Sequence, residues 1–200
     1  MVQGCLFFWR YQIYLLPVCE HVHLLGFASE GSDREQAVVA LHNLALILPP
    51  EQLEEAESLL RRAIEERSQY FGPEHFATLG SRFNLALNLT QRGKFEEAEE
   101  TFRELIEAQG RTLGLANPET LRSTRVYALL LFNLKREAEA RKLCQEILET
   151  ELPDHEAFSQ MVQEQQSRTR DLLKQFEERD FLYGEWGILR SENMVQLDSR

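Results

Sequence analysis

The sequence predicts an all-α protein, a solenoid of about three stacked helix pairs followed by a capping helix. Two observations predict this fold. Leu, Ala, Glu, Gln and Arg are abundant among the 200 residues, whereas the helix breakers Gly and Pro number only 10 and 6. The chain also resembles itself at intervals of 41 or 42 residues, and a fixed period of that length is typical of repeat arrays.

The period is visible at several independent positions. Ala45, Ala86 and Ala128 are separated by 41 and then 42 residues, and Gly72 recurs 42 residues later as Gly114. The tetrapeptide NLAL occurs at residues 43–46 and again at 84–87. The pair Ala-Glu occurs at 56–57 and 98–99, and the pair Thr-Leu at 78–79 and 120–121. Agreement at so many positions is hard to obtain by chance.

These matches predict an array over residues 34–150, with repeats at about 36–77, 78–119 and 120–150. Residues 1–33 are predicted as an apolar extension, either a helix that docks on the first repeat or a poorly ordered segment. Residues 151–182 are predicted as a capping helix with a thin apolar stripe that breaks at 165–169, and residues 183–200 as a loose tail. The predicted stripe consists of Phe158, Met161, Val162, Leu172, Leu173 and Phe176.

Each repeat is predicted to contain two antiparallel helices, most clearly in the middle copy. The first helix is expected over residues 78–91, where apolar residues recur at helical spacing, and Gly93 ends it. The second is expected over residues 95–112, with Ala98 of the EEAEE motif where the two helices cross, because a small side chain lets two backbones approach. The inward side chains predicted for the pair are Leu79, Arg82, Leu85, Ala86, Leu89, Phe95, Ala98, Phe102, Leu105 and Ile106.

The glutamates of this second helix are predicted to face water. They are Glu96, Glu97, Glu99, Glu100 and Glu104. Beyond the helix, Asn117 is expected to cap the next helix and Pro118 to occupy its first turn.

The repeats resemble the tetratricopeptide repeat, in the long form of about 42 residues that kinesin light chains contain. The resemblance covers about residues 36–150 and is carried by ALHNLALILPPEQLEEAESLLRRAIEERSQYFGPEHFATL, NLALNLTQRGKFEEAEETFRELIEAQGRTLGLANPETL and a weaker third copy, YALLLFNLKREAEARKLCQEIL. It implies a right-handed α–α superhelix whose first helices line a concave groove that binds extended or partly folded peptides. The copies depart from one another at the turn, where the first has Pro49-Pro50 and the third lacks the glycine.

The resemblance maps the peptide-binding groove onto seven side chains: His42, Asn43, Phe83, Asn84, Leu87, Arg122 and Arg125. An asparagine can both donate to and accept from a peptide backbone, and Phe83 with Leu87 could form an apolar pocket. The two arginines suit a carboxylate and favour an acidic peptide. The alternative is that the asparagines bond to neighbouring helices and that the arginines pair with glutamates of the second copy.

Composition restricts the classes of partner and compartment. A net charge of −11 argues against nonspecific nucleic-acid binding. The odd, scattered cysteines Cys5, Cys19 and Cys144 indicate a reducing compartment, and hence the cytoplasm. Residues 5–27 are apolar but too interrupted for a membrane span, and a secretory signal within residues 1–28 is the minority alternative.

No sequence motif predicts an enzyme, a bound cofactor or a metal site. Phosphate-binding glycine loops, nucleophile elbows, HExxH and paired CxxC are all missing from the sequence. Cys19, His21 and His23 are too crowded for a typical metal site. Cys144 is expected in the core, and His75 and His155 in solvent near helix starts.

The sequence therefore predicts a noncatalytic adaptor that holds a protein or peptide partner in its groove. The alternative is a structural or assembly piece, in which the ends of the array or the helix spanning 158–176 pair with another copy or with a neighbouring domain.

Overall fold

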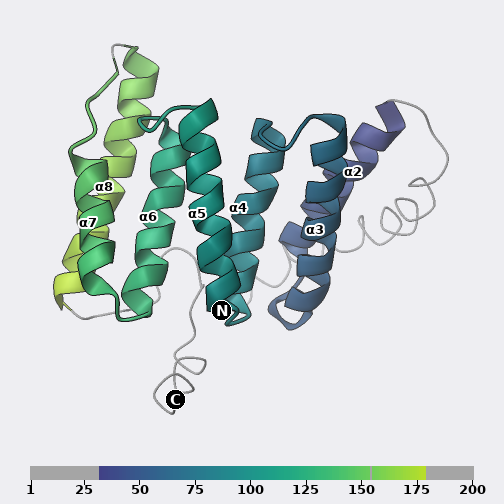
Figure 1. Ribbon diagram of the computed structural model, residues 1–200, viewed down its shortest axis with the longest axis horizontal. Coiled ribbons are helices and arrows are strands. Elements are labelled where there is room, and N and C mark those ends of the chain that lie inside the picture. Colours follow the sequence, from purple (N-terminus) through teal and green to yellow (C-terminus); the bar gives the residue numbers. More distant parts are fainter. Residues whose placement is uncertain (1–31, 154, 179–200) are drawn as a thin grey trace, which may run out of the picture. The chain divides into compact units, whose positions relative to one another are not determined.

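The computed structural model describes residues 32–153 and 155–178, and within these ranges all regular structure is helical (Figure 1). The elements are α2 (Ser32–Ile47), the 3-10 helix η1 (Pro50–Gln52), α3 (Leu53–Tyr70), α4 (Phe76–Gln91), α5 (Phe95–Thr112), α6 (Pro118–Asn133), α7 (Glu137–Leu148) and α8 (Glu156–Glu178). They belong to two compact units that divide within α4, after Asn84. The predicted apolar extension (except its last two residues) and the predicted tail lie outside the described residues.

In the first unit, α2 packs against α3. Leu41 and Ala63 form a buried apolar contact between the two helices, bordered by Ala40 and Leu59. In place of a glycine turn, the chain leaves α2 through Pro49, whose backbone is extended, and enters η1 at Pro50. Proline suits the first turn of a helix because that turn has no partner for its N–H.

In the second unit, α6 packs against three helices, α5, α7 and α8, and α8 also packs against α7 (Figure 1). Leu121, Ile147 and Val162 bring α6, α7 and α8 together in one apolar cluster. The inward face predicted for α5 is largely confirmed, since Phe95, Ala98, Phe102 and Leu105 are buried. Helix α5 also has the bounds expected from its periodicity.

The turn that enters each new repeat is built twice in the same way. The Thr78 hydroxyl donates to the Gly72 carbonyl at 2.9 Å, and the Thr120 hydroxyl donates to the Gly114 carbonyl at the same distance. Both glycines have positive φ, 102° and 92°, a conformation that residues with a β-carbon rarely adopt. This equivalence shows that the 42-residue period is a period of structure.

The helix caps in these turns are also equivalent. Asn117 accepts a hydrogen bond from the Glu119 amide at 2.9 Å, as predicted. His75 occupies the corresponding place before α4, where its Nδ1 accepts from the Ala77 amide at 3.3 Å. The expectation that His75 only faces solvent is therefore wrong, since it is half-buried and caps a helix.

The contact face of α8 differs from the predicted stripe. Phe158 and Met161 are exposed, whereas Gln165, Gln166 and Thr169, at the predicted break, are buried. Gln166 donates to the carbonyls of Thr150, Leu148 and Ile147 at 2.9, 3.3 and 3.4 Å. The buried face of α8 continues through these polar residues because one of them bonds to the end of α7.

Candidate functional site

A polar cluster lies within the first unit, where α2, α3 and α4 meet. His42 of α2 is 3.1 Å from the Ser81 hydroxyl and 3.3 Å from the Asn84 amide nitrogen, both on α4. Arg67 of α3 donates to the Ser81 hydroxyl at 2.6 Å and to the Ala77 carbonyl at 2.7 Å. Two of the predicted groove residues, His42 and Asn84, are thus in direct contact.

These bonds determine the tautomer of His42. An amide nitrogen only donates, so Nε2 of His42 accepts from Asn84 and the ring proton is on Nδ1. Nδ1 then donates to Ser81, whose own proton goes to the Ala77 carbonyl at 3.2 Å. Burial, and secondarily the charge of Arg67, lowers the pKa of His42 from 6.5 to about 4. The imidazole is therefore neutral at physiological pH and acts as a fixed polar link between α2 and α4.

The remaining predicted groove residues differ in exposure. Asn43 is exposed on α2, and Leu87 is half-buried on α4. Phe83 and Arg125 are buried, so in this conformation they support their helices from within. Arg122 is half-buried and forms an ion pair with Glu119, three residues earlier on α6, at 3.1 Å.

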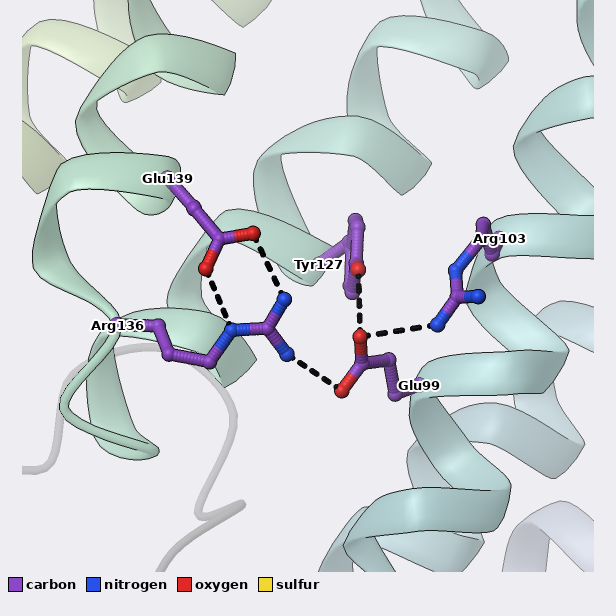
Figure 2. A network of polar contacts seen from close by, with 5 residues as sticks. All are labelled: Glu99, Arg103, Tyr127, Arg136 and Glu139. Atoms are coloured by element: carbon purple, nitrogen blue, oxygen red, sulfur yellow. Dashed lines mark hydrogen bonds and ion pairs between the residues drawn. The ribbon is translucent and has the colours of Figure 1, made fainter.

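The second unit contains a network of charged groups that links α5, α6 and the start of α7 (Figure 2). Glu99 accepts from Arg136 at 2.7 Å, from Arg103 at 3.0 Å and from the Tyr127 hydroxyl at 3.2 Å. Arg136 also holds Glu139 through two bonds of 2.7 Å. The hydrogen bond from Arg136 is the main cause of a lowered pKa at Glu99, so this carboxylate stays ionised and is not suited to acid–base catalysis near neutral pH.

This network corrects the prediction that all five glutamates of α5 face water. The side chain of Glu99 is only 16% exposed, because Arg136 and Tyr127 lie over it. Glu57, 42 residues earlier in the equivalent Ala-Glu pair, is also buried and forms an ion pair with Arg61 at 2.9 Å. The glutamate that follows the alanine of this pair therefore has a structural role in both copies.

The described residues contain no group of three or more potential metal ligands among His, Cys, Asp and Glu. The cluster of Cys19, His21 and His23 lies outside the described part of the chain. Cys144 is buried as predicted, and burial raises the pKa of its thiol to about 11, which keeps it protonated. Within residues 32–153 and 155–178, no helix is long and apolar enough to cross a membrane.

Comparison with known proteins identifies the repeats. The family model described as "Tetratricopeptide repeat" matches residues 50–111. This stretch of the chain therefore contains a tetratricopeptide repeat. No curated protein matches it.

Solved structures extend the likeness beyond the residues that the family model matches. The TPR-like repeats of a putative kinesin light chain from Podosopora anserina superpose with a TM-score of 0.59 at 21% identity, covering 84% of this chain and 85% of that one. BtubC (BKLC) from P. vanneervenii gives a TM-score of 0.63 at 15% identity, covering 94% and 80%. At these identities the likeness shows the fold, which is the predicted tetratricopeptide-repeat solenoid with repeats similar to those of kinesin light chains.

The tetratricopeptide-repeat fold supports a protein-interaction or scaffold role in general, and proteins with such repeats are generally noncatalytic. Helix α2 also exposes two apolar residues that were not predicted from the sequence. Val39 is 42% exposed and Leu46 52% exposed, one turn before and one turn after Asn43. Their spacing of four and three residues from Asn43 was a signal in the sequence, since residues at that spacing share a helix face.

Proposed function

We propose that this protein is a noncatalytic adaptor that binds a linear segment of a partner protein along the first helices of its repeats. The observation that carries the proposal is the exposed face of α2, where Asn43 stands between the apolar side chains of Val39 and Leu46. Water does not favour exposed apolar side chains on a packed helix, and a bound segment would cover them. Asn43 would then pair with the backbone of that segment.

The proposed contact residues are the accessible members of the predicted set. Asn43, Asn84, Leu87 and Arg122 would touch the partner, whereas His42, Phe83 and Arg125 would hold the helices that present them. The half-buried Arg122 would exchange its carboxylate partner Glu119 for a carboxylate of the peptide. Such an exchange would favour an acidic segment as the ligand of the second unit. The compartment that we propose is the cytoplasm.

An array of acidic and neutral peptides, probed with the full chain and with a variant carrying Asn84→Ala and Arg122→Ala, tests the proposal. We expect the double variant to lose binding to the acidic peptides. Lys142→Ala is the matched control, because Lys142 is an exposed cation on the second helix of its repeat. Equal binding by the native chain and the double variant would disprove binding through these residues.

The second candidate function is assembly through α8. Phe158 and Met161 near its start are 43% and 49% exposed, and Leu152 in the preceding loop is 45% exposed. These side chains would pair with another copy of the chain or with a neighbouring domain. Light scattering on the native chain and on the Phe158→Ser, Met161→Ser variant discriminates the two functions, and a native chain that is monomeric throughout would exclude self-association.

A further inference from the structure

The face by which α8 packs against its neighbours is exposed near the start of the helix. Val162 is buried with Leu121 of α6 and Ile147 of α7 in one apolar cluster. Phe158 precedes Val162 by four residues and therefore lies on the same helix face, yet it is 43% exposed. Met161, three residues after Phe158, is 49% exposed. The apolar core of the second unit thus continues without interruption into an exposed apolar surface.

The loop before α8 extends this surface. The Ser159 amide donates to the His155 carbonyl at 2.9 Å, and the His155 ring lies edge-to-face with the Phe158 ring at 6.3 Å between centroids. Leu152, three residues before His155, is 45% exposed. We call Leu152, His155, Phe158 and Met161 the α8 N-terminal face. Several large apolar side chains in one short segment differ from the scattered single ones that a protein surface normally carries.

The charges in this segment are negative. Glu149, Glu151 and Glu156 are exposed, and none of them forms an ion pair with another residue that the structure describes. Asp154, whose placement lies outside the described residues, can only add to the negative charge. The dipole of α8 contributes roughly half a positive charge at this end of the helix, which offsets only part of the charge of these carboxylates.

The cations of α6, α7 and α8 do not cancel this charge. Four of them form an ion pair with a carboxylate of their own helix: Arg122, Lys142, Arg168 and Lys174. Arg125 is buried, and Arg141 lies about two turns before the end of α7. Arg170 lies more than about three turns after Phe158 on α8. The α8 N-terminal face is therefore an apolar surface with carboxylates at its border, which complements a partner that is apolar and basic.

We propose that the α8 N-terminal face binds a basic amphipathic helix of another protein. Apolar side chains of that helix pack on Phe158 and Met161, and its Lys or Arg side chains pair with Glu151 and Glu156. A second copy of this chain is disfavoured because each copy carries a net charge of −11. This inference rests on the second candidate function, assembly through α8, and names the partner of that face. It does not involve the first helices of the repeats.

The test measures the affinity of the full chain for synthetic peptides by fluorescence polarisation. The probe is a leucine–lysine peptide whose leucines recur at helical spacing, and the comparison peptides are its leucine–glutamate counterpart and a scrambled leucine–lysine peptide. We expect the probe to bind severalfold more tightly than either comparison peptide. The variant with Phe158→Ser and Met161→Ser and the variant with Glu151→Gln and Glu156→Gln should each bind the probe severalfold more weakly. Neither variant should lower the midpoint of thermal unfolding, because the replaced side chains are exposed.

Two control variants match these substitutions elsewhere in the chain. Tyr70→Ser removes a side chain that is 46% exposed in the first unit. Glu100→Gln with Glu104→Gln removes two exposed carboxylates of α5 and changes the net charge by the same amount as the variant at the α8 N-terminal face. Both controls are expected to bind the probe with native affinity.

Each other outcome has a definite meaning. Native affinity for the probe in the Phe158→Ser, Met161→Ser variant would overturn the inference. Equal losses in the two glutamate variants would also overturn it, because binding would then follow net charge alone. Preference for the leucine–glutamate peptide, or self-association that Phe158→Ser with Met161→Ser abolishes, would leave assembly through α8 standing and assign the face to a different partner. The acidic-peptide array tests binding along the first helices independently of all these results.

Discussion

Lys135 has a positive φ of 64°, alone among the non-glycine residues that the structure describes. It stands 42 residues after Gly93, which has a φ of 73° in the equivalent turn. The turn bonds are also equivalent, from the Gly93 amide to the Thr90 carbonyl at 3.1 Å and from the Lys135 amide to the Phe132 carbonyl at 3.0 Å. The third repeat thus keeps the turn although it lacks the glycine.

Replacement of Lys135 by glycine should stabilise the protein. A left-handed conformation costs a residue with a β-carbon about 1–2 kcal/mol, and the extra entropy of unfolded glycine offsets about 0.5–1 kcal/mol of the gain. We therefore expect Lys135→Gly to raise the free energy of unfolding by about 0.5–1 kcal/mol, measured by urea denaturation. Lys142→Gly, within α7, is the control and should lower it by about 1 kcal/mol. Destabilisation by Lys135→Gly would show that the side chain contributes more than the backbone strain costs.

Glu99 is the second residue whose replacement has a predictable effect. Glu99→Gln removes the charge that three donors share and leaves Arg136 with only Glu139 as an anionic partner. Hydrogen bonds to charged groups contribute about 1.5–3 kcal/mol each, and the glutamine oxygen retains part of this. We expect a loss of about 1–3 kcal/mol in the free energy of unfolding. Glu104→Gln, exposed on the same helix, should have no measurable effect.

The pH dependence of stability should differ between these two proteins. The pKa of Glu99 is lowered in the folded state, so its contribution is complete above the pKa of the unfolded chain, about 4.3, and is lost as pH falls through the lower folded value. The native chain should therefore lose more stability than Glu99→Gln between pH 6 and pH 3. Parallel stability–pH curves for the two proteins would contradict the lowered pKa.

The single helices were the part of the structure that was predicted best from the sequence. Apolar periodicity together with Gly93, Asn117 and Pro118 was sufficient to predict α5 and the start of α6, because these signals are local. Periodicity assigns a residue to a face but not to the neighbour that covers it. The burial of Glu99 depends on Arg136, which is 37 residues away, and Phe158 is exposed although it belongs to the predicted apolar stripe.

Attachment of α8 should weaken when one polar side chain, Gln166, is replaced. Gln166 donates to the carbonyl of Leu148, the last residue of α7, and to the carbonyl of Thr150 just beyond the helix, and the last carbonyls of a helix have no partner within it. Gln166→Leu keeps the bulk but removes the donor from these half-buried carbonyls, at a cost of about 1–3 kcal/mol. Amide hydrogen exchange measured on the Gln166→Leu variant should be faster in α8 than in α5. Gln163→Leu, on the exposed side of α8, is the control, and equal exchange in the two variants would show that apolar contacts alone hold the helix.

At the scale of the whole molecule, the repeat period predicted which helices carry the candidate binding residues, but not which of those residues reach solvent. Asn43 and Phe83 were assigned to equivalent surfaces, yet one is exposed and the other is buried. The exposed pair of Val39 and Leu46 was not singled out, because apolar residues in a helix are more often part of the core. The difference between core and surface depends on the packing of neighbouring helices, which a single sequence does not specify.

The net charge of −11 also predicts how an acidic ligand would bind. Repulsion by the whole chain would act at long range and slow the approach of an acidic peptide, whereas the proposed pairing with Arg122 would act only at contact. Salt shortens the Debye length from about 30 Å at 0.01 M to about 10 Å at 0.1 M. We therefore expect the association rate constant of an acidic peptide to rise severalfold over this range, and its dissociation rate constant to rise as well. Stopped-flow fluorescence measures both, with an uncharged peptide as the control whose association rate should not change. An association rate that falls with salt would mean that the field around Arg122 and Arg125 outweighs the charge of the whole molecule, so that acidic partners are attracted before contact.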